Sequence, residues 1–137
     1  MQKLTCALLV DDDQTTNYLN RLLLKRLEVT DKILVALNGR EALDLLQLHC
    51  HDATPDCPVL ILLDVKMPVM DGFAFLEAYN LLSLAHKNAI LIVMLTTSLH
   101  PQDLDRVQQL NIADFLNKPL TREKVDQVLQ NHFDRHL

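Results

Sequence analysis

The stretch that most limits the fold of this chain is an apolar run, Val59 to Leu63, that ends on a carboxylate, Asp64. An unbroken apolar run of this length suits a strand that is buried on both faces, as in a parallel sheet. A loop with Pro68 follows, and Asp71-Gly72 opens a new segment with apolar residues at helical spacing. Asp64 therefore lies at a strand end, on the edge where open α/β sheets bind ligands.

Similar apolar segments recur along the chain and alternate with segments of helical spacing. The predicted strands are Leu4–Val10, Lys32–Ala36, Val59–Leu63, Ala89–Leu95 and Ala113–Asn117. The predicted helices are Gln14–Leu27, Arg40–His49, Asp71–Leu84, Pro101–Leu110 and a last one that opens at Thr121. Strict alternation of strand and helix predicts a parallel sheet with helices on both faces.

Length and charge exclude several classes of protein. With 137 residues, 49% of them hydrophobic, the chain is long enough for one domain with its own core, and we expect a single domain over residues 1–137 with no output domain. The net charge of −5 argues against direct nucleic-acid binding, which needs clustered lysine and arginine. The longest apolar run, Ala89–Leu95, is too short to span a membrane. The start of the chain does not resemble a signal peptide, so a cytoplasmic location is the default expectation.

The three cysteines, Cys6, Cys50 and Cys57, form no paired framework in the sequence, as expected for a protein of a reducing compartment. His49–Cys57 groups histidine, cysteine and aspartate, which raises the alternative of a metal site. Its spacing fits no zinc pattern, and we therefore interpret the segment as a solvated loop.

Polar groups follow four of the predicted strands: Asp11-Asp12-Asp13, Asp64, Thr96-Thr97-Ser98 and Lys118. The carboxyl ends of parallel strands share one edge of a sheet, so we expect these residues to converge. Crowded carboxylates repel one another and attract a hard divalent cation such as Mg²⁺. A lysine and a hydroxyl beside them would suit an anionic group on Asp64, and aspartate can accept a phosphoryl group. Taken alone, each residue has an ordinary structural explanation, and only the ordered combination favours this chemistry.

Four motifs together identify a resemblance that covers essentially the whole chain. They are LLVDDD at Leu8–Asp13, LLDVKMPVMDG at Leu62–Gly72, MLTTS at Met94–Ser98 and FLNKP at Phe115–Pro119. The sequence resembles the receiver domains of two-component response regulators, of the chemotaxis-regulator kind. The resemblance implies a flavodoxin-like, doubly wound (βα)5 fold with five parallel strands in the order 2-1-3-4-5.

The resemblance also implies a role for each matching residue. Asp64 would be the phosphoacceptor, with Thr96 and Lys118 binding oxygens of the phosphoryl group. Mg²⁺ would be held by Asp11, Asp12, Asp64 and the backbone carbonyl of Lys66. Thr96 and Phe115 would form the switch, and a cis peptide would join Lys118 to Pro119.

Three features are treated separately. Asp13 is interpreted as a helix cap rather than a metal ligand. Phe115 lacks the hydroxyl of the tyrosine that many receivers carry, so a switch there would depend on packing. The segment His49–Pro58 is longer than usual for the family, and no role is predicted for it.

The function that follows is a switch, not an enzyme with an external substrate. The resemblance implies that a sensor histidine kinase or a histidine phosphotransfer protein phosphorylates Asp64. The face Leu99–Leu137 would then bind an output protein whose identity the sequence does not reveal, and a homodimer of the phosphorylated form through this face is left open. A phosphorelay intermediate and a constitutive receiver-like binding module are the alternatives.

Two other classes fit less well. A flavodoxin-like cofactor binder would need a phosphate loop after the first strand, where this chain has acids. An aspartyl-phosphate hydrolase would need an acid at Lys66.

Overall fold

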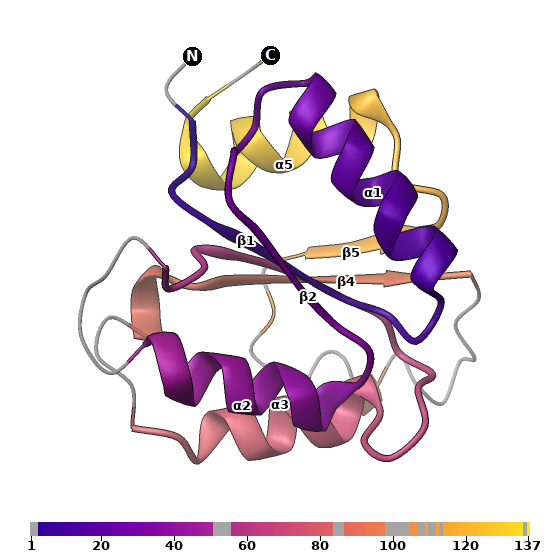
Figure 1. Cartoon of the computed structure of the whole chain (residues 1–137), viewed down its shortest axis with the longest axis vertical. Helices are drawn as coiled ribbons and strands as arrows, with labels where there is room; N and C mark the ends of the chain where they lie inside the picture. Colours follow the sequence, from indigo (N-terminus) through magenta and orange to yellow (C-terminus); the bar gives the residue numbers. More distant parts are fainter. Residues whose placement is uncertain are drawn as a thin grey trace.

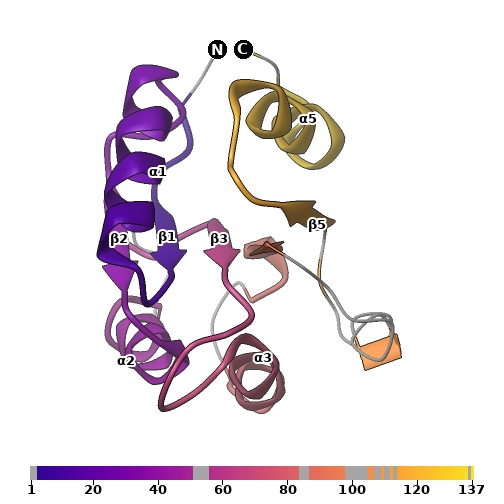
Figure 2. The same cartoon turned by 90° about the vertical axis from the view of Figure 1, so that its right-hand side faces the viewer.

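The computed structural model describes residues 3–50, 56–83, 87–97, 105–106, 109, 112, 114–135 and 137. These residues form one five-stranded parallel sheet in the order β2-β1-β3-β4-β5. The strands are β1 (Ala7–Val10), β2 (Ile33–Ala36), β3 (Leu60–Leu63), β4 (Leu91–Thr96) and β5 (Asp114–Asn117). The predicted α/β fold and its strand order are confirmed. Figure 2 views the sheet from the carboxyl ends of its strands.

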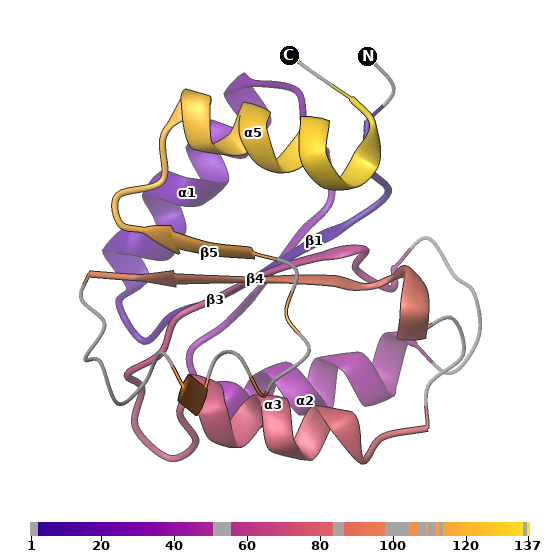
Figure 3. The ribbon, with the colours of Figure 1, turned by 180° about the vertical axis from the view of Figure 1, so that it is seen from behind.

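Four α-helices among the described residues cover the two faces of the sheet. They are α1 (Gln14–Arg26), α2 (Gly39–His49), α3 (Gly72–Asn80) and α5 (Arg122–Phe133). Figures 1 and 3 show α1 and α5 on one face of the sheet and α2 and α3 on the other. The predicted helix Pro101–Leu110 falls largely outside the described residues. Within the described part of the chain, no helix combines the length and the apolar character needed to cross a bilayer.

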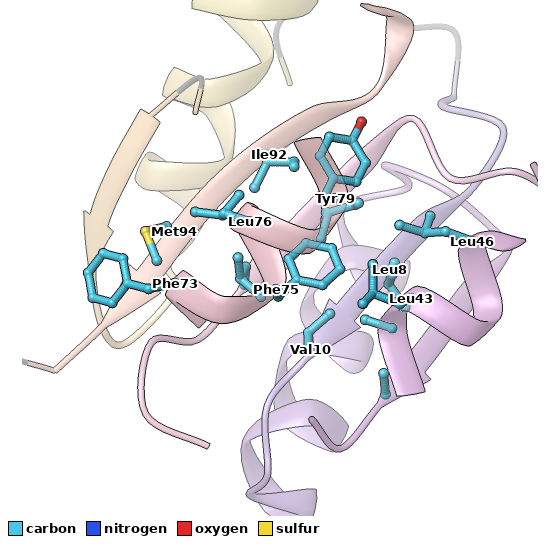
Figure 4. Close-up of a cluster of buried hydrophobic side chains, with 14 of the residues drawn as sticks. Leu8, Val10, Leu43, Leu46, Phe73, Phe75, Leu76, Tyr79, Ile92 and Met94 are labelled. Atoms are coloured by element: carbon cyan, nitrogen blue, oxygen red, sulfur yellow. The ribbon is translucent and has the colours of Figure 1, made fainter. Parts of the chain in front are cut away.

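Each face of the sheet has its own hydrophobic core, because successive side chains of a strand point to opposite sides. On the α2 and α3 side, Leu8 and Val10 of β1 pack with Phe75 and the other side chains of Figure 4. On the α1 and α5 side, Leu9 of β1 and Leu62 of β3 pack with residues of both helices. The central strands β1, β3 and β4 are thus buried on both faces, as the apolar runs predicted, whereas the edge strands β2 and β5 are partly exposed.

Helix caps lie at the edge of the sheet where strands end. The Asp13 side chain accepts hydrogen bonds from the backbone N–H groups of Thr15 and Thr16, which confirms the predicted cap. Thr121 accepts from the N–H of Lys124 at the start of α5, again as predicted. Each cap satisfies backbone donors that a helix start leaves unpaired and so fixes where the chain turns.

Three predicted boundaries differ by two residues or more, and the first of them is the start of the first strand, at Ala7 rather than Leu4. The fourth strand begins at Leu91 rather than Ala89, because Lys87–Ala89 forms a turn of 3₁₀ helix before the chain joins the sheet. The third helix ends at Asn80 rather than Leu84. In all three places apolar residues continue past the end of the regular element, so the apolar pattern overestimated its length.

The expectation that no cysteines pair was also wrong. Cys50, at the end of α2, and Cys57, shortly before β3, form a disulfide with a Cα–Cα distance of 4.9 Å. They are 7 residues apart in the sequence. Cys6 is a buried free thiol. In the disulfide form the sulfurs of Cys50 and Cys57 are bonded to each other and are not available as metal ligands. The predicted loop residues 51–55 lie outside the described part of the chain.

Candidate functional site

The register of the central strands brings Asp11 and Asp64 together. Val10 at the end of β1 is the partner of Leu63 at the end of β3, and each strand is followed by its aspartate. The backbone N–H of Asp64 donates to the carbonyl oxygen of Val10 at 2.9 Å, so the two strand ends are tied to each other. The predicted convergence of these carboxylates follows directly from the parallel pairing.

Asp11, Asp12 and Asp64 form a compact acidic triad. One carboxylate oxygen from each residue lies within 4.8 Å of the others. The Asp11 and Asp64 residues are buried, with exposed fractions of 4% and 8%, whereas Asp12 is exposed to solvent. Oxygen ligands that are partly buried and open to water on one side fit Mg²⁺, which keeps several waters and prefers only one or two carboxylates.

Lys118 supplies the positive charge beside this triad. Its Nζ lies 2.6 Å from Asp11 Oδ2 and 3.3 Å from Asp64 Oδ1. Lys118 follows the end of β5, where its backbone N–H donates to the carbonyl oxygen of Thr96 at 2.7 Å. The peptide bond to Pro119 is cis, which confirms the prediction. The hydrogen bond to Thr96 fixes the strand end from which the lysine reaches the two buried carboxylates.

The electrostatics of the site follow from burial and charge crowding. Burial, and next the charge of Asp11, raise the pKa of Asp64 above 3.8, although Lys118 and the hydrogen bond from Val65 oppose the rise. Burial alone would lower the pKa of Lys118, but its contacts with Asp11 and Asp64 raise it above 10.5. The lysine therefore stays charged and partly compensates two carboxylates that repel each other.

Gly72 lets the loop after β3 fold back onto Asp64. Its backbone N–H donates to the carbonyl oxygen of Val65 at 2.8 Å. A Cβ atom at this position would collide with the backbone oxygen of Asp64, so no other residue fits without a shift of the chain. The exposed Lys66 lies in this loop, two residues after Asp64.

The two residues predicted to form the switch lie in different environments. Thr96 ends β4 and is buried, with 3% exposed, beside the strand end that carries Lys118. Phe115 of β5 is partly buried and packs against the core on the α2 and α3 side. Thr96 thus lies at the strand end that is bonded to Lys118, at the same edge of the sheet as the acidic triad. Phe115 instead packs against the core between the sheet and helices α2 and α3. Ser98 lies outside the described residues.

A groove opens next to the acidic triad, between α1 and the segment that connects β5 to α5. It has a volume of about 570 Å³ and reaches from Lys118 and Pro119 to Leu19, Leu22 and Arg26 of α1. Leu19 and Leu22 are 56% and 39% exposed, so this side of α1 offers apolar surface to solvent.

Three residues near the site were missed in the sequence. Gly72 was interpreted only as part of the Asp-Gly start of a helix. Nothing in the spacing of residues along the sequence indicates that its backbone lies against Asp64. Asn17 and Asn20 of α1 are buried beneath the carboxylates, with 3% and 9% exposed. Their signal was available in the sequence, because two amides occupy a helix in which Leu19, Leu22, Leu23 and Leu27 have the spacing of an apolar face.

Comparison with known proteins agrees with this architecture. Residues 7–130 match the family model described as the response regulator receiver domain. A probable methanogenesis regulatory protein, FilR2 of Methanothrix harundinacea, is 32% identical over 123 residues, which cover 90% of this chain and 77% of that protein. Two-component response regulator 24 of Arabidopsis thaliana is 31% identical, over 93% of this chain and 82% of that protein.

The fold is shared with solved structures as well. A two-component response regulator from Cytophaga hutchinsonii superposes with a TM-score of 0.83 at 23% identity, over 98% of this chain and 100% of that one. This likeness concerns the fold, whereas the family match rests on the sequence of residues 7–130. The chain belongs to the response regulator receiver domain family.

Proposed function

We propose that this chain is the phosphoacceptor of a two-component signalling system, with Asp64 as the residue that is phosphorylated. The observation that carries the proposal is the grouping of Asp11, Asp12, Asp64 and Lys118 at one edge of the sheet. Buried carboxylates with a single lysine between them suit the transfer of an anionic group once a divalent cation is present. The acidic triad is typical of the Mg²⁺ site of receiver domains.

In the proposed reaction an oxygen of Asp64 forms a bond to phosphorus. The bond between phosphorus and an imidazole nitrogen of the donor breaks, and its electron pair stays on that nitrogen. The chemistry that Mg²⁺ supplies when bound to Asp11, Asp12, Asp64 and the Lys66 carbonyl is neutralisation of charge on the phosphoryl oxygens. Lys118 adds a second positive charge beside the position of the phosphoryl group.

The switch would start at Thr96 and Lys118. A phosphoryl group on Asp64 adds negative charge between these two residues, and new charge-assisted hydrogen bonds would draw them toward it. Since the N–H of Lys118 is bonded to the carbonyl of Thr96, a movement of β4 would be passed to β5 and to Phe115. Reversing a conformational equilibrium from 1:99 to 99:1 takes about 5.5 kcal/mol of differential interaction.

The partners follow from this chemistry. A sensor histidine kinase or a histidine phosphotransfer protein would supply the phosphoryl group, and the apolar groove beside Lys118 offers it a contact surface. The output would be a change in protein binding by the face Leu99–Leu137, of which β5 and α5 are described. The proposal includes a single receiver domain that acts in the cytoplasm, without an activity on an external substrate.

Phosphotransfer between proteins tests the proposal. The chain is mixed with a histidine phosphotransfer protein that carries a labelled phosphohistidine, with Mg²⁺ or with EDTA. We expect label to move to the chain only with Mg²⁺, and not to the Asp64→Asn variant. The control is Asp44→Asn, which changes an exposed carboxylate on α2 and should accept label as the wild type does. Transfer to Asp64→Asn at the wild-type rate would contradict the proposal.

A further inference from the structure

A small polar cavity lies directly beneath the acidic triad, between α1 and the sheet. Leucines from three strands form its apolar part, and Asp11, Asp64, Asn17 and Asn20 form its polar part. Its volume is about 10 Å³, close to the smallest space that holds one water molecule. The cavity therefore has both the size and the polar lining that an internal water requires.

The two asparagines of α1 that line this cavity are unusual residues for a buried helix face. Asn17 and Asn20 are 3% and 9% exposed, whereas Leu19 and Leu22 of the same helix are 56% and 39% exposed. Helices normally turn leucines inward and amides outward, because a buried amide must find hydrogen-bond partners. Asparagine also has a lower helix propensity than leucine. Packing alone does not explain why α1 turns two amides toward Asp11 and Asp64.

Only one of the two polar atoms of the Asn17 amide has a hydrogen-bond partner among the described residues. Its Nδ2 donates to the backbone oxygen of Asp11 at 2.8 Å, while its Oδ1 is buried and finds no hydrogen-bond partner among the described residues. A buried acceptor without a partner costs about 1–3 kcal/mol. A water in the cavity that Asn17 lines would donate to Oδ1 and would have Asp11, Asp64 and Asn20 as further neighbours.

We propose that Asn17 and Asn20 are positioning residues for phosphoryl transfer, which hold one internal water behind Asp11 and Asp64. Asn17 also fixes the carbonyl of Asp11 and with it the turn that carries Asp12. This inference rests on the proposed function of Asp64. A water hydrogen-bonded to the Asp64 carboxylate from the cavity would keep that carboxylate oriented toward an incoming phosphoryl group. A displacement of about 1 Å in a reacting group can slow a reaction by about 100-fold.

The test compares Asn17→Leu and Asn20→Leu with wild type and with a matched control. Leucine has the same number of side-chain heavy atoms and the same branching as asparagine, but it has no amide and its two methyl groups make it larger. The control is Thr30→Val, because Thr30 is fully buried and its hydroxyl contacts the backbone of Lys32, yet it precedes β2 at the opposite edge of the sheet. All four proteins are phosphorylated with acetyl phosphate over a range of Mg²⁺ concentrations, and the folded fraction of each is measured by urea denaturation.

We expect both asparagine variants to lose about tenfold or more in the maximal rate of phosphorylation per folded molecule. Asn17→Leu should also raise the Mg²⁺ concentration at half-maximal rate, because it frees the turn with Asp12, whereas Asn20→Leu should leave that concentration unchanged. Thr30→Val should lose stability but keep the wild-type rate. If both asparagine variants match Thr30→Val in rate, the inference is wrong. If wild type itself is not phosphorylated, the proposed function fails instead.

A second readout does not depend on activity or on the folding of any variant. A high-resolution crystal structure of the metal-free wild type should show an ordered water within hydrogen-bond distance of Asn17 Oδ1. A dry cavity, or an Asn17 amide that turns to bond another residue, would overturn the inference.

Discussion

Lys118 and Asp11 are joined by a contact of 2.6 Å between Nζ and Oδ2, although 107 residues separate them in the chain. Both side chains are largely buried, with 16% and 6% exposed. The contact connects the end of β1 to the end of β5 across the site, and it compensates a carboxylate that also faces Asp64. Without a metal ion, Lys118 is therefore both a part of the site and a stabilising element of the fold.

Replacing Lys118→Met should destabilise the metal-free protein. It removes one partner of a buried ion pair and leaves two neighbouring carboxylates without a positive charge, a change that costs about 3 kcal/mol in comparable sites. Urea denaturation in EDTA measures the loss, and added Mg²⁺ should restore part of it, because the cation binds the folded state.

The matched control for this change is Arg40→Met, which breaks the exposed pair with Asp44. Exposed pairs on a helix contribute little, so the free energy of unfolding should stay near that of the wild type. A Lys118→Met protein as stable as the Arg40→Met protein in EDTA would contradict this role of Lys118.

The raised pKa of Asp64 predicts a pH-dependent stability. The folded protein binds a proton at Asp64 more tightly than the unfolded chain, whose carboxyl titrates near 3.8. The contribution of Asp64 to stability is therefore fully present below this pH and is lost as the pH rises through the folded pKa. In EDTA at about pH 7, Asp64→Asn should thus have a higher free energy of unfolding than wild type.

The advantage of Asp64→Asn should shrink as the pH falls toward 3.8, since the wild-type carboxyl then becomes neutral as well. Urea denaturation of both proteins across this range measures the difference. A difference that grows as the pH falls would show that the pKa of Asp64 is shifted in the other direction.

The close approach of Gly72 to Asp64 predicts that a side chain at position 72 would disturb the phosphorylation site. Gly72→Ala should displace Asp64 or the loop that carries Lys66, because the new Cβ meets the backbone oxygen of Asp64. We expect the rate of phosphorylation by acetyl phosphate to fall by about tenfold or more per folded molecule.

The control for Gly72→Ala is Ala42→Gly in α2, a buried helical position away from the site. Ala42→Gly should lower stability by about 1 kcal/mol or more through helix propensity and lost packing, yet keep the rate of the wild type. Equal rates for the two variants would argue that Gly72 matters only for stability.

The disulfide predicts a redox-dependent stability. Closing a short loop of 7 residues between Cys50 and Cys57 restricts the unfolded chain and stabilises the fold by about 2 kcal/mol in the loop-entropy account. Reductant should lower the free energy of unfolding of the wild type by this order, and should leave a Cys57→Ala variant unchanged. In a reducing compartment the dithiol form is expected.

Alkylation of the native protein provides the control for the cysteines. After reduction, Cys57 should react readily because it is partly exposed. Cys6 should remain protected, since it is buried and its burial raises the pKa of the thiol to about 11. Rapid modification of Cys6 together with Cys57 would contradict the burial of Cys6.

Much of the fold was predictable because its signals are local. Apolar runs such as Val59–Leu63 report strands that are buried on both faces, and caps such as Asp13 and Thr121 report where helices begin. The convergence of Asp11, Asp64 and Lys118 was predictable for a topological reason. Parallel strands end at one edge, so residues that follow them meet without any knowledge of their contacts.

The features that were missed depend on contacts across the fold. The pairing of Cys50 with Cys57 depends on how close the end of α2 lies to the segment before β3, and an odd number of cysteines does not reveal that distance. The inward direction of Asn17 and Asn20 depends on how α1 is rotated against the sheet, and its leucines suggested a different apolar face. The closeness of Gly72 to Asp64 depends on the return of the loop after β3.

The measurement that tests the central claim most directly is the intact mass of the protein after incubation with acetyl phosphate. It is made on wild type with Mg²⁺, on wild type with excess EDTA, and on Asp64→Asn with Mg²⁺. The account predicts one phosphoryl adduct on wild type with Mg²⁺ and none in the other two samples. No adduct in any sample, or an adduct that persists in Asp64→Asn, would contradict the assignment of Asp64 as the phosphoacceptor.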